Sequence, residues 1–327
     1  MKSLVTGSSG HLGEGLVRTL QTRGDDVVGL DILHSRFTDV VGSITDRDCV
    51  KQCMVGVDTV FHTATLHKPH LVTHTMQDFI DTNMTGTLVL LEEAVRAGVA
   101  RFIFTSTTSV FGDAMRPAEG VPTVWVTEDL RPIPRNIYGV TKNAAEDICQ
   151  LFHKRHGLPC LVVRTPGFFR EHDDDPTMRL ACTDGNIKAN EFLYRRADLE
   201  DVVQAHLLAV EKAETVGFDR FIISATAPFR PEDCLELSQD APSVLKRRVP
   251  AYESVYEQLG WKMFPRLDRV YVNAKAREVL GWRPQYDFRY VIECLHAGTN
   301  PKSQLSRDVG VKGYHGEKFE NGPYPVE

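Results

Sequence analysis

The chain has 327 residues, 42% of them hydrophobic, which is enough to build one large domain or two that share a cleft. Its formal net charge of -6 argues against nucleic-acid binding, and the lack of an apolar run of about 20 residues argues against a membrane span. Seven scattered cysteines and no predicted signal peptide favour a cytoplasmic protein with reduced thiols.

The first predicted elements meet at a glycine-rich junction. Residues 2–7 indicate a short buried strand, and residues 11–24 an amphipathic helix. Backbone N–H groups at such a helix start can bind a pyrophosphate. The next strand, 26–31, ends in an acid that can bind an adenosine ribose and repel a 2′-phosphate. We therefore expect NAD as cofactor, bound by Gly7, Gly10, His11, Leu12, Gly13 and Asp31.

Strand and helix signals then alternate along the chain. We expect strands near 57–63, 101–106 and 159–164, and helices near 78–97 and 138–156. This βαβ series predicts an α/β fold, a Rossmann-type doubly wound parallel sheet. A helix and a strand return to it at about 196–226, and 228–300 reads as proline-punctuated and mostly helical. The expected division is an NAD-binding domain over 1–165 and a smaller substrate-binding lid and tail over 166–195 and 227–327, with no periodic element after residue 300.

Two polar clusters carry the candidate chemistry. Tyr138 and Lys142 are four residues apart on a predicted helix and share a face. A lysine ammonium near a phenol lowers the tyrosine pKa, so the tyrosine can take a proton from a substrate hydroxyl while hydride leaves the adjacent carbon. Five hydroxyl residues, 105–109, end the strand before this helix. Ligands bind at that end of a parallel sheet, so one of these hydroxyls can bond the substrate oxygen.

The segment 62–74 contains four histidines. His67, His70 and His74 could share a helical face like a zinc-ligand set, but no carboxylate or cysteine completes it nearby, so we predict no metal site. We expect His62 to be structural. Because the segment leaves the carboxyl end of a strand, substrate contact by Lys68 and His70 is the favoured interpretation.

Several motifs together resemble the extended short-chain dehydrogenase/reductases, in the NAD-dependent sugar epimerase/dehydratase group. They are TGSSGHLG, VDTVFHTAT, DTNMTGTLVLLEEA, RFIFTSTTSVFG, YGVTK, DLEDVVQAHLLA and LGWRP, spread over about residues 1–300. The resemblance implies Tyr138 as general acid or base, Lys142 at the nicotinamide ribose and Thr107 as the hydroxyl partner. It also implies a homodimer through the helices near 78–97 and 138–156. Further cofactor contacts implied are Ile44, Thr63, Ala64, Thr65 and Asn83.

Departures from the family pattern bear on the substrate. Dehydratases carry Asp-Glu where this chain has Thr108-Ser109, and nucleotide-sugar epimerases usually have asparagine where it has Gly167. Lys68-Pro69 and the irregular tail are similar to uronate dehydrogenases, which implies a free sugar or sugar acid as substrate. The expected substrate contacts are Lys68, His70, Thr108, Ser109, Arg164 and Phe168. A nucleotide-sugar 4-epimerase with tightly bound NAD and a non-catalytic NAD-bound sensor remain as alternatives.

Overall fold

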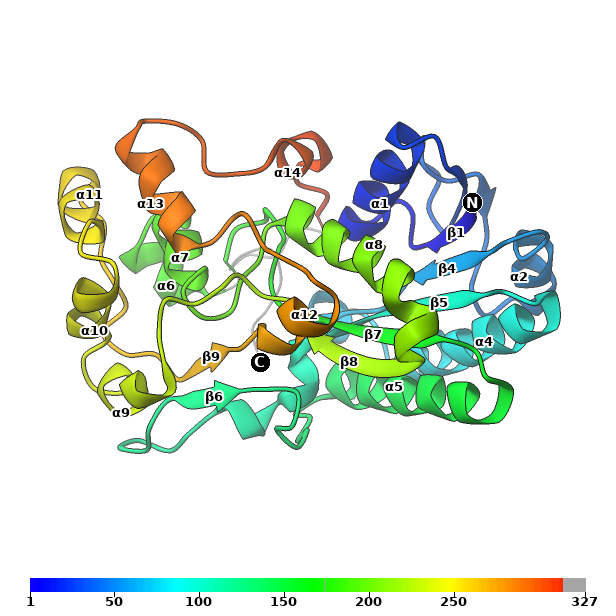
Figure 1. Cartoon of the computed structure of the whole chain (residues 1–327), viewed down its shortest axis with the longest axis horizontal. Coiled ribbons are helices and arrows are strands. Elements are labelled where there is room, and N and C mark those ends of the chain that lie inside the picture. Colours follow the sequence, from blue (N-terminus) through cyan, green and yellow to red (C-terminus); the bar gives the residue numbers. More distant parts are fainter. Residues whose placement is uncertain (174, 314–327) are drawn as a thin grey trace.

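The computed structural model describes residues 1–173 and 175–313 (Figure 1). Seven parallel strands form one sheet in the order β3-β2-β1-β4-β5-β7-β8, so the strand order reverses between β1 and β4. This confirms the predicted doubly wound sheet. The strands are β1 (Lys2–Thr6), β2 (Asp26–Asp31), β3 (Val40–Val41), β4 (Thr59–His62), β5 (Arg101–Thr107), β7 (Cys160–Thr165) and β8 (Phe218–Ile222).

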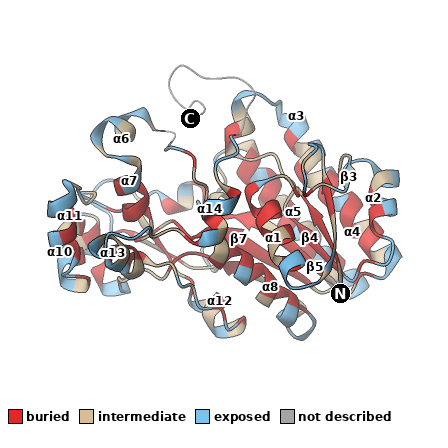
Figure 2. Cartoon of the chain, turned by 90° about the horizontal axis from the view of Figure 1, so that it is seen from above, coloured by how far each residue is buried: buried red, intermediate tan, exposed pale blue. Residues whose placement is uncertain are grey.

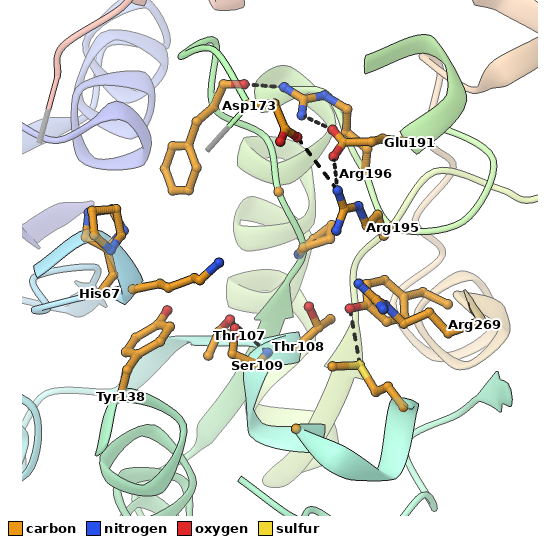
Figure 3. A pocket seen from close by; sticks show the side chains of 18 of the residues that line it. His67, Thr107, Thr108, Ser109, Tyr138, Asp173, Glu191, Arg195, Arg196 and Arg269 are labelled. Atoms are coloured by element: carbon orange, nitrogen blue, oxygen red, sulfur yellow. Dashed lines mark hydrogen bonds and ion pairs between the residues drawn. The ribbon is translucent and has the colours of Figure 1, made fainter. Parts of the chain in front are cut away.

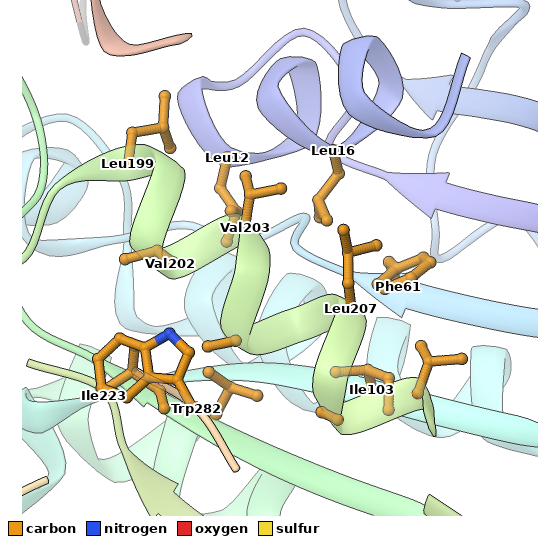
Figure 4. Packing of buried hydrophobic residues seen from close by; sticks show 14 of the residues in the cluster. Leu12, Leu16, Phe61, Ile103, Leu199, Val202, Val203, Leu207, Ile223 and Trp282 are labelled. Atoms are coloured by element: carbon orange, nitrogen blue, oxygen red, sulfur yellow. The ribbon is translucent and has the colours of Figure 1, made fainter. Parts of the chain in front are cut away.

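Helices cover both faces of the sheet, which is why its central strands are buried (Figure 2). One face carries α1 (His11–Thr22) and α8 (Leu199–Val216), and the other α2 (Arg47–Cys53), α4 (Gly86–Ala97) and α5 (Ile137–His156). On the first face Leu16 of α1 and Leu207 of α8 pack with Phe61 of β4 (Figure 4). Each helix buries an apolar stripe on the sheet and so fixes the strand ends.

The predicted helix near 78–97 is one segment with a defect inside it. It begins as α3 (Met76–Phe79), where the Thr75 side chain accepts a hydrogen bond from the Asp78 N–H, and continues through a π-helical turn, Ile80–Thr85, into α4. The π turn admits one extra residue per turn and is frequent at functional sites. Asn83 lies in this turn and is buried.

A smaller unit lies beside the sheet. Its apolar core joins residues such as Leu237, Val244 and Tyr256, and its two strands pair in parallel. Both strands are absent from the sequence prediction, which has 228–300 as mostly helical and assigns residues 124–126 to the NAD-binding domain with no element there. The elements of this unit are β6 (Val124–Val126), α6 (Pro176–Ala181), α7 (Asp184–Glu191), a 3-10 turn at Pro231–Asp233, α9 (Cys234–Leu237), α10 (Ala241–Arg248), α11 (Tyr252–Leu259), β9 (Arg269–Tyr271) and α13 (Phe288–His296). Further 3-10 turns lie at Lys68–Val72, Thr108–Phe111 and Asp113–Met115.

The chain returns to the sheet twice after residue 227, which the expected domain division does not include. Trp282, which follows α12 (Ala274–Val279), is 1% exposed in the core of the large unit, and its indole N–H donates to the Asp201 carbonyl at 3.0 Å (Figure 4). A further helix, α14 (Gln304–Val309), packs on α1 and α8. The prediction of no element after residue 300 is therefore wrong, because this six-residue helix is too short to give a periodic signal and depends on its Ser303 cap and on packing against α1 and α8. Residues 314–327 of the predicted tail lie outside the described residues.

One buried carboxylate ties α5 to three strands. Glu146 accepts hydrogen bonds from the Ser106 hydroxyl of β5 at 2.6 Å and from the Arg220 guanidinium of β8 at 2.8 Å. The Arg164 guanidinium of β7 donates to both of its oxygens, at 3.0 and 2.7 Å. These bonds satisfy a carboxylate that is wholly removed from water, and they set the position of α5 on the sheet.

Glu146→Ala should lower the free energy of unfolding by about 3–5 kcal/mol, because it leaves the buried Arg164 charge uncompensated. The matched control is Asp147→Ala, which removes the exposed neighbouring carboxylate that pairs with Arg220 at 2.8 Å. It should cost less than about 1 kcal/mol. Urea unfolding measures both. Similar small losses for the two variants would contradict the role assigned to Glu146.

Candidate active site

The glycine-rich turn brings three elements into close contact. Gly7 has φ 72°, and a Cβ there would lie 2.7 Å from the Ala64 nitrogen after β4. A Cβ on Gly13 of α1 would lie 1.9 Å from the Gly7 carbonyl oxygen, so neither position accepts a side chain. Gly10 precedes α1 and contributes no capping side chain. The first N–H groups of α1 therefore suit an anionic group such as a pyrophosphate.

Asp31 at the end of β2 is held beside this turn. Its Oδ2 accepts a hydrogen bond from the Ser9 N–H at 3.0 Å, and its Oδ1 accepts one from the Leu33 N–H at 2.9 Å. Each carboxylate oxygen keeps a further lone pair that a ribose hydroxyl can use. The geometry fits the NAD preference expected from Asp31, since a 2′-phosphate would meet a fixed negative charge.

The residues expected on either side of the cofactor are arranged around the end of β4. Asn83 accepts hydrogen bonds from the Thr65 hydroxyl and the Leu66 N–H, both at 2.9 Å, and donates to the Thr141 hydroxyl of α5 at 3.1 Å. Ile44 packs directly on Gly86, where a Cβ would lie 2.6 Å from its Cδ1. The segment with Thr63, Ala64 and Thr65 is therefore fixed to both neighbouring helices. Leu12 points into the core under α1, so only its backbone faces the turn.

His62 and His11 have structural partners. The His62 ring bonds the hydroxyls of Thr6 and Thr87 at 2.8 and 2.9 Å, and burial, then the Lys142 charge, lowers its pKa well below the ordinary value. The structural role expected for His62 agrees with this geometry. His11 Nε2 lies 2.7 Å from Glu171 Oε1. Because Glu171 engages the His11 ring, the expected cofactor contact of His11 would be made by its backbone.

Tyr138, Lys142 and Thr107 come together at the carboxyl end of β5. Thr107 ends that strand, while Tyr138 and Lys142 occupy the first two turns of α5. Figure 3 shows Tyr138, Thr107 and Thr108 facing the same cavity. Tyr138 and Thr107 line the same cavity, and the Lys142 ammonium donates to the Thr105 carbonyl at 2.6 Å. A substrate hydroxyl between Thr107 and Tyr138 would meet both side-chain oxygens.

The electrostatics of this trio differ from the sequence expectation in one respect. Burial raises the pKa of Tyr138 to about 12, and the Thr107 hydrogen bond only partly offsets it. Burial also lowers the pKa of Lys142 to about 7, although Cys149 and Glu146 act in the opposite direction. The expectation that Lys142 lowers the tyrosine pKa is therefore corrected, because desolvation of the phenolate dominates and the ammonium bonds a backbone carbonyl instead. At neutral pH Tyr138 holds its proton.

A cavity of about 320 Å³ adjoins these hydroxyls, at the lower end of the range for small-molecule sites. Three of the predicted substrate residues line it: Lys68, Thr108 and Ser109. Arg164 does not, because Glu146 holds its guanidinium under α5. Phe168 packs in the core and its neighbour Phe169 lines the cavity instead, while His70 accepts a hydrogen bond from the His67 N–H at 3.0 Å. His67 and Pro69 take the place expected for His70.

The cavity wall opposite Tyr138 is rich in cations, most of which the sequence does not reveal. Figure 3 shows Arg195, Arg196 and Arg269 on that side, and Arg195 pairs with Glu191 at 2.6 Å. Among the described residues Arg116 pairs with no carboxylate, and burial, then the charges of Arg135 and Arg269, lowers its pKa. The sequence signals for this set are Lys68, expected as a substrate contact, and the Arg195-Arg196 doublet before α8. The full set of cations is Lys68, Arg116, Arg135, Lys188, Arg195, Arg196 and Arg269.

The chain after α14 closes over the start of α1. The Lys312 N–H donates to Glu171 Oε1 at 2.9 Å, and the Lys312 ammonium donates to Glu14 Oε2 at 2.5 Å. Burial would raise the pKa of Glu171, but the His11 hydrogen bond and charge and the Lys312 N–H outweigh it and bring that pKa to about 2. Glu171 thus joins the glycine-rich turn, the cavity wall and the C-terminal segment.

Metal-site and membrane searches apply to residues 1–173 and 175–313. Within them no cluster of three or more His, Cys, Asp or Glu side chains has a geometry suited to a metal ion. In the same residues none of the helices is both long enough and apolar enough to cross a bilayer.

Comparison with known proteins identifies the family. Residues 3–223 match the NAD dependent epimerase/dehydratase family. The chain belongs to this family. The match confirms the resemblance to extended short-chain dehydrogenase/reductases and NAD as cofactor.

Individual relatives differ in how much of the chain they match. A 3-beta-hydroxysteroid dehydrogenase of Mycolicibacterium neoaurum is 31% identical over 89% of this chain and 90% of its own length. A UDP-glucose 4-epimerase of Erwinia amylovora is 33% identical over 47% of this chain and 49% of its own length. Two other curated relatives are matched over 40% and 59% of their own length. The crystal structure of a Thermotoga maritima UDP-glucose 4-epimerase, 24% identical, aligns over 91% of this chain and 99% of its own with a TM-score of 0.61, which shows the shared fold.

Tyr138→Phe should reduce turnover by about 10²–10⁴-fold, because the phenol oxygen is the expected proton carrier. NAD affinity should stay within about threefold, because the turn and Asp31 remain intact. The matched control is Tyr271→Phe, whose phenol lines the same cavity and donates to the Met115 sulfur at 3.3 Å. It should keep most of the activity. A Tyr138→Phe enzyme with a near wild-type rate would assign the proton to another group.

Lys142→Met should change how stability depends on pH. The Lys142 pKa is about 7 in the folded chain and about 10.4 when unfolded, so between these values the unfolded chain binds more protons. Wild-type stability should therefore rise with pH across this window, by up to about 1.4 kcal/mol per unit relative to the variant. Urea unfolding at several pH values from 7 to 10 measures the difference. A pH-independent difference would contradict the buried, easily deprotonated lysine.

Proposed function

We propose that the protein is an NAD-dependent oxidoreductase that oxidises a hydroxyl-bearing carbon of a free sugar acid. The observation that carries the proposal is one cavity with two unlike sides. Thr107 and Tyr138 supply hydroxyls on one side, and arginines supply positive charge on the other (Figure 3). A sugar acid has both groups that these sides complement, a carbinol and a carboxylate.

The proposed mechanism follows from the positions of the side chains. Thr107 and Tyr138 hydrogen bond the oxygen of the reacting hydroxyl and hold its carbon at the inner end of the cavity. As hydride leaves that carbon, the phenolate form of Tyr138 would accept the hydroxyl proton, and the C–O bond becomes a carbonyl. NAD, when bound, supplies the hydride acceptor and a positive charge that favours the phenolate. Lys142 lies one turn further along α5, where it contributes charge as long as it is protonated.

The proposed substrate class is inferred from the cations that line the cavity and from Gly167. Arg116 is placed to pair with a carboxylate, whereas Arg269 beside it already pairs with Asp268. Lys68 reaches the cavity from the segment after β4. Gly167 offers no side chain to a diphosphate. An uncharged steroid would bring no counter-charge for Arg116, so the cavity disfavours the substrate named for the Mycolicibacterium neoaurum relative.

A nucleotide-sugar 4-epimerase is the second candidate. It is favoured by Arg195 and Arg196, which could hold a diphosphate, and by the structural neighbour solved with UDP-glucose. The two candidates differ in their redox outcome, because an epimerase returns the hydride to its substrate and releases no NADH.

We also propose a homodimer in the cytoplasm, formed through α4 and α5. The exposed faces of these helices carry Leu88, Val140 and Leu151, which are 37%, 47% and 43% exposed. Apolar side chains gathered on neighbouring helices are typical of an interface. All seven cysteines are free, which supports a reducing compartment.

The direct test is a panel of free uronic acids and nucleotide sugars, each incubated with enzyme and NAD. NADH absorbance and product chromatography are read on the same samples. We expect NADH release with one or more uronic acids and an oxidised product in equal amount. Conversion of a nucleotide sugar to its epimer without net NADH would replace this proposal with the second candidate.

Arg116→Gln should raise KM for the anionic substrate by about tenfold with little change in kcat, because it removes a charge that binds ground state and transition state alike. Arg266→Gln is the matched control, since that arginine is exposed and pairs with Glu119 at 3.2 Å outside the cavity. Steady-state kinetics on the best substrate of the panel measure both. An unchanged KM for Arg116→Gln would remove this residue from substrate binding.

A further inference from the structure

A second cavity of about 190 Å³ lies beside the substrate cavity. It is enclosed by α7, α13 and the segment that leads into α14, and its walls include Phe192, Trp261 and Leu295. None of the candidate catalytic hydroxyls lines it. The two cavities share Lys188 and Arg196, so they are neighbours separated by the side chains of these cations.

The lining of the second cavity carries more positive than negative charge. Its one acid, Asp198, already accepts hydrogen bonds from the Glu200 N–H at 2.8 Å and the Ser303 N–H at 3.2 Å. Four cations face it: Arg170, Lys188, Arg196 and Lys302. A buried or half-buried cluster of like charges is stabilised by an anion.

Two of the four cations are already neutralised. The Lys188 ammonium donates to Asp184 Oδ2 at 2.7 Å, and the Arg196 guanidinium donates to Glu191 Oε2 at 2.8 Å. The open charge therefore belongs to the remaining two, Arg170 and Lys302.

Lys302 is half-buried and forms no ion pair with any residue of the described chain. Nη1 of Arg170 donates to the Ser306 and Arg307 carbonyls at 3.4 and 3.3 Å, but its Nε is buried without a hydrogen-bond partner among the same residues. Burial, then the Arg170 charge, lowers the pKa of Lys302. A buried donor without a partner is costly, and a ligand carboxylate beside Arg170 and Lys302 would satisfy both groups.

We propose that this cavity binds a small amphipathic monocarboxylate, with its apolar body between Phe192, Trp261 and Leu295 and its carboxylate at Lys302 and Arg170. The size agrees, because an apolar cavity of about 150 Å³ is known to accept benzene, so 190 Å³ holds one ring with a carboxylate. Aromatic walls favour a flat ring over a polar sugar. The proposal is independent of the substrate proposed above.

Calorimetry on the full chain saturated with NAD tests this site, with benzoate as the probe and benzyl alcohol as its neutral counterpart. Benzoate should bind at one site, at least about tenfold more tightly than benzyl alcohol. Lys302→Gln should weaken benzoate by about tenfold, and Leu295→Trp should weaken it at least as much by filling the cavity. Thermal unfolding checks that each variant is folded. If Leu295→Trp does not fold, Lys302→Gln tests the proposal alone, because Lys302 is half-buried and lies outside the core clusters.

Two controls locate the site. Lys212→Gln removes an exposed charge on α8, and Arg116→Gln removes a charge from the substrate cavity, so both should keep benzoate affinity within about twofold. Equal binding of benzoate and benzyl alcohol, or wild-type benzoate affinity in Lys302→Gln, would overturn the proposal. Loss of benzoate binding in Arg116→Gln but not in Lys302→Gln would assign the anion to the substrate cavity instead.

Discussion

The buried carboxylate of Glu146 is the contact on which the geometry of the active site depends. Tyr138, Lys142 and Glu146 are spaced four residues apart, so they form one row along the buried face of α5. Glu146 fixes the far end of this row to Ser106, the residue before Thr107, and to arginines of β7 and β8. The phenol at the near end is thereby held in the same cavity as the Thr107 hydroxyl. A small shift of α5 would separate the two groups that we propose bond the same substrate oxygen.

The cavity forms where the large and small units meet. Tyr138, Thr107 and Thr108 come from the sheet and α5, whereas Lys188 and Arg269 come from α7 and β9 of the smaller unit. The end of the cavity proposed to react and the end proposed to bind the anion thus belong to different units. One fold can host different substrates when the residues that contact them lie outside the part that carries the chemistry.

Local sequence patterns predict the parts of the site that depend on neighbouring residues. The turn from Gly7 to Gly13 requires residues without side chains, and Tyr138 and Lys142 are one helical turn apart. The spacing of these residues in the sequence therefore predicts both features. The group of cations on the cavity wall cannot be predicted from the sequence, because Arg116 and Arg269 are separated by more than 150 residues and meet only after β6 pairs with β9. For the same reason Arg164 is a free cation in the sequence but a partner of Glu146 in the fold. The pKa of Tyr138 is likewise set by burial, which spacing alone does not show.

The central claim is that the cavity beside Tyr138 takes a free sugar acid rather than a nucleotide sugar. The most direct measurement is calorimetry, in which the uronic acid turned over fastest, UDP and GDP are injected separately into NAD-saturated protein. The account predicts saturable binding of the uronic acid and no measurable binding of UDP or GDP, because Gly167 offers no side chain to a diphosphate and Arg195 and Arg196 already pair with Glu191. Micromolar binding of either nucleotide, with none of the sugar acid, would contradict it.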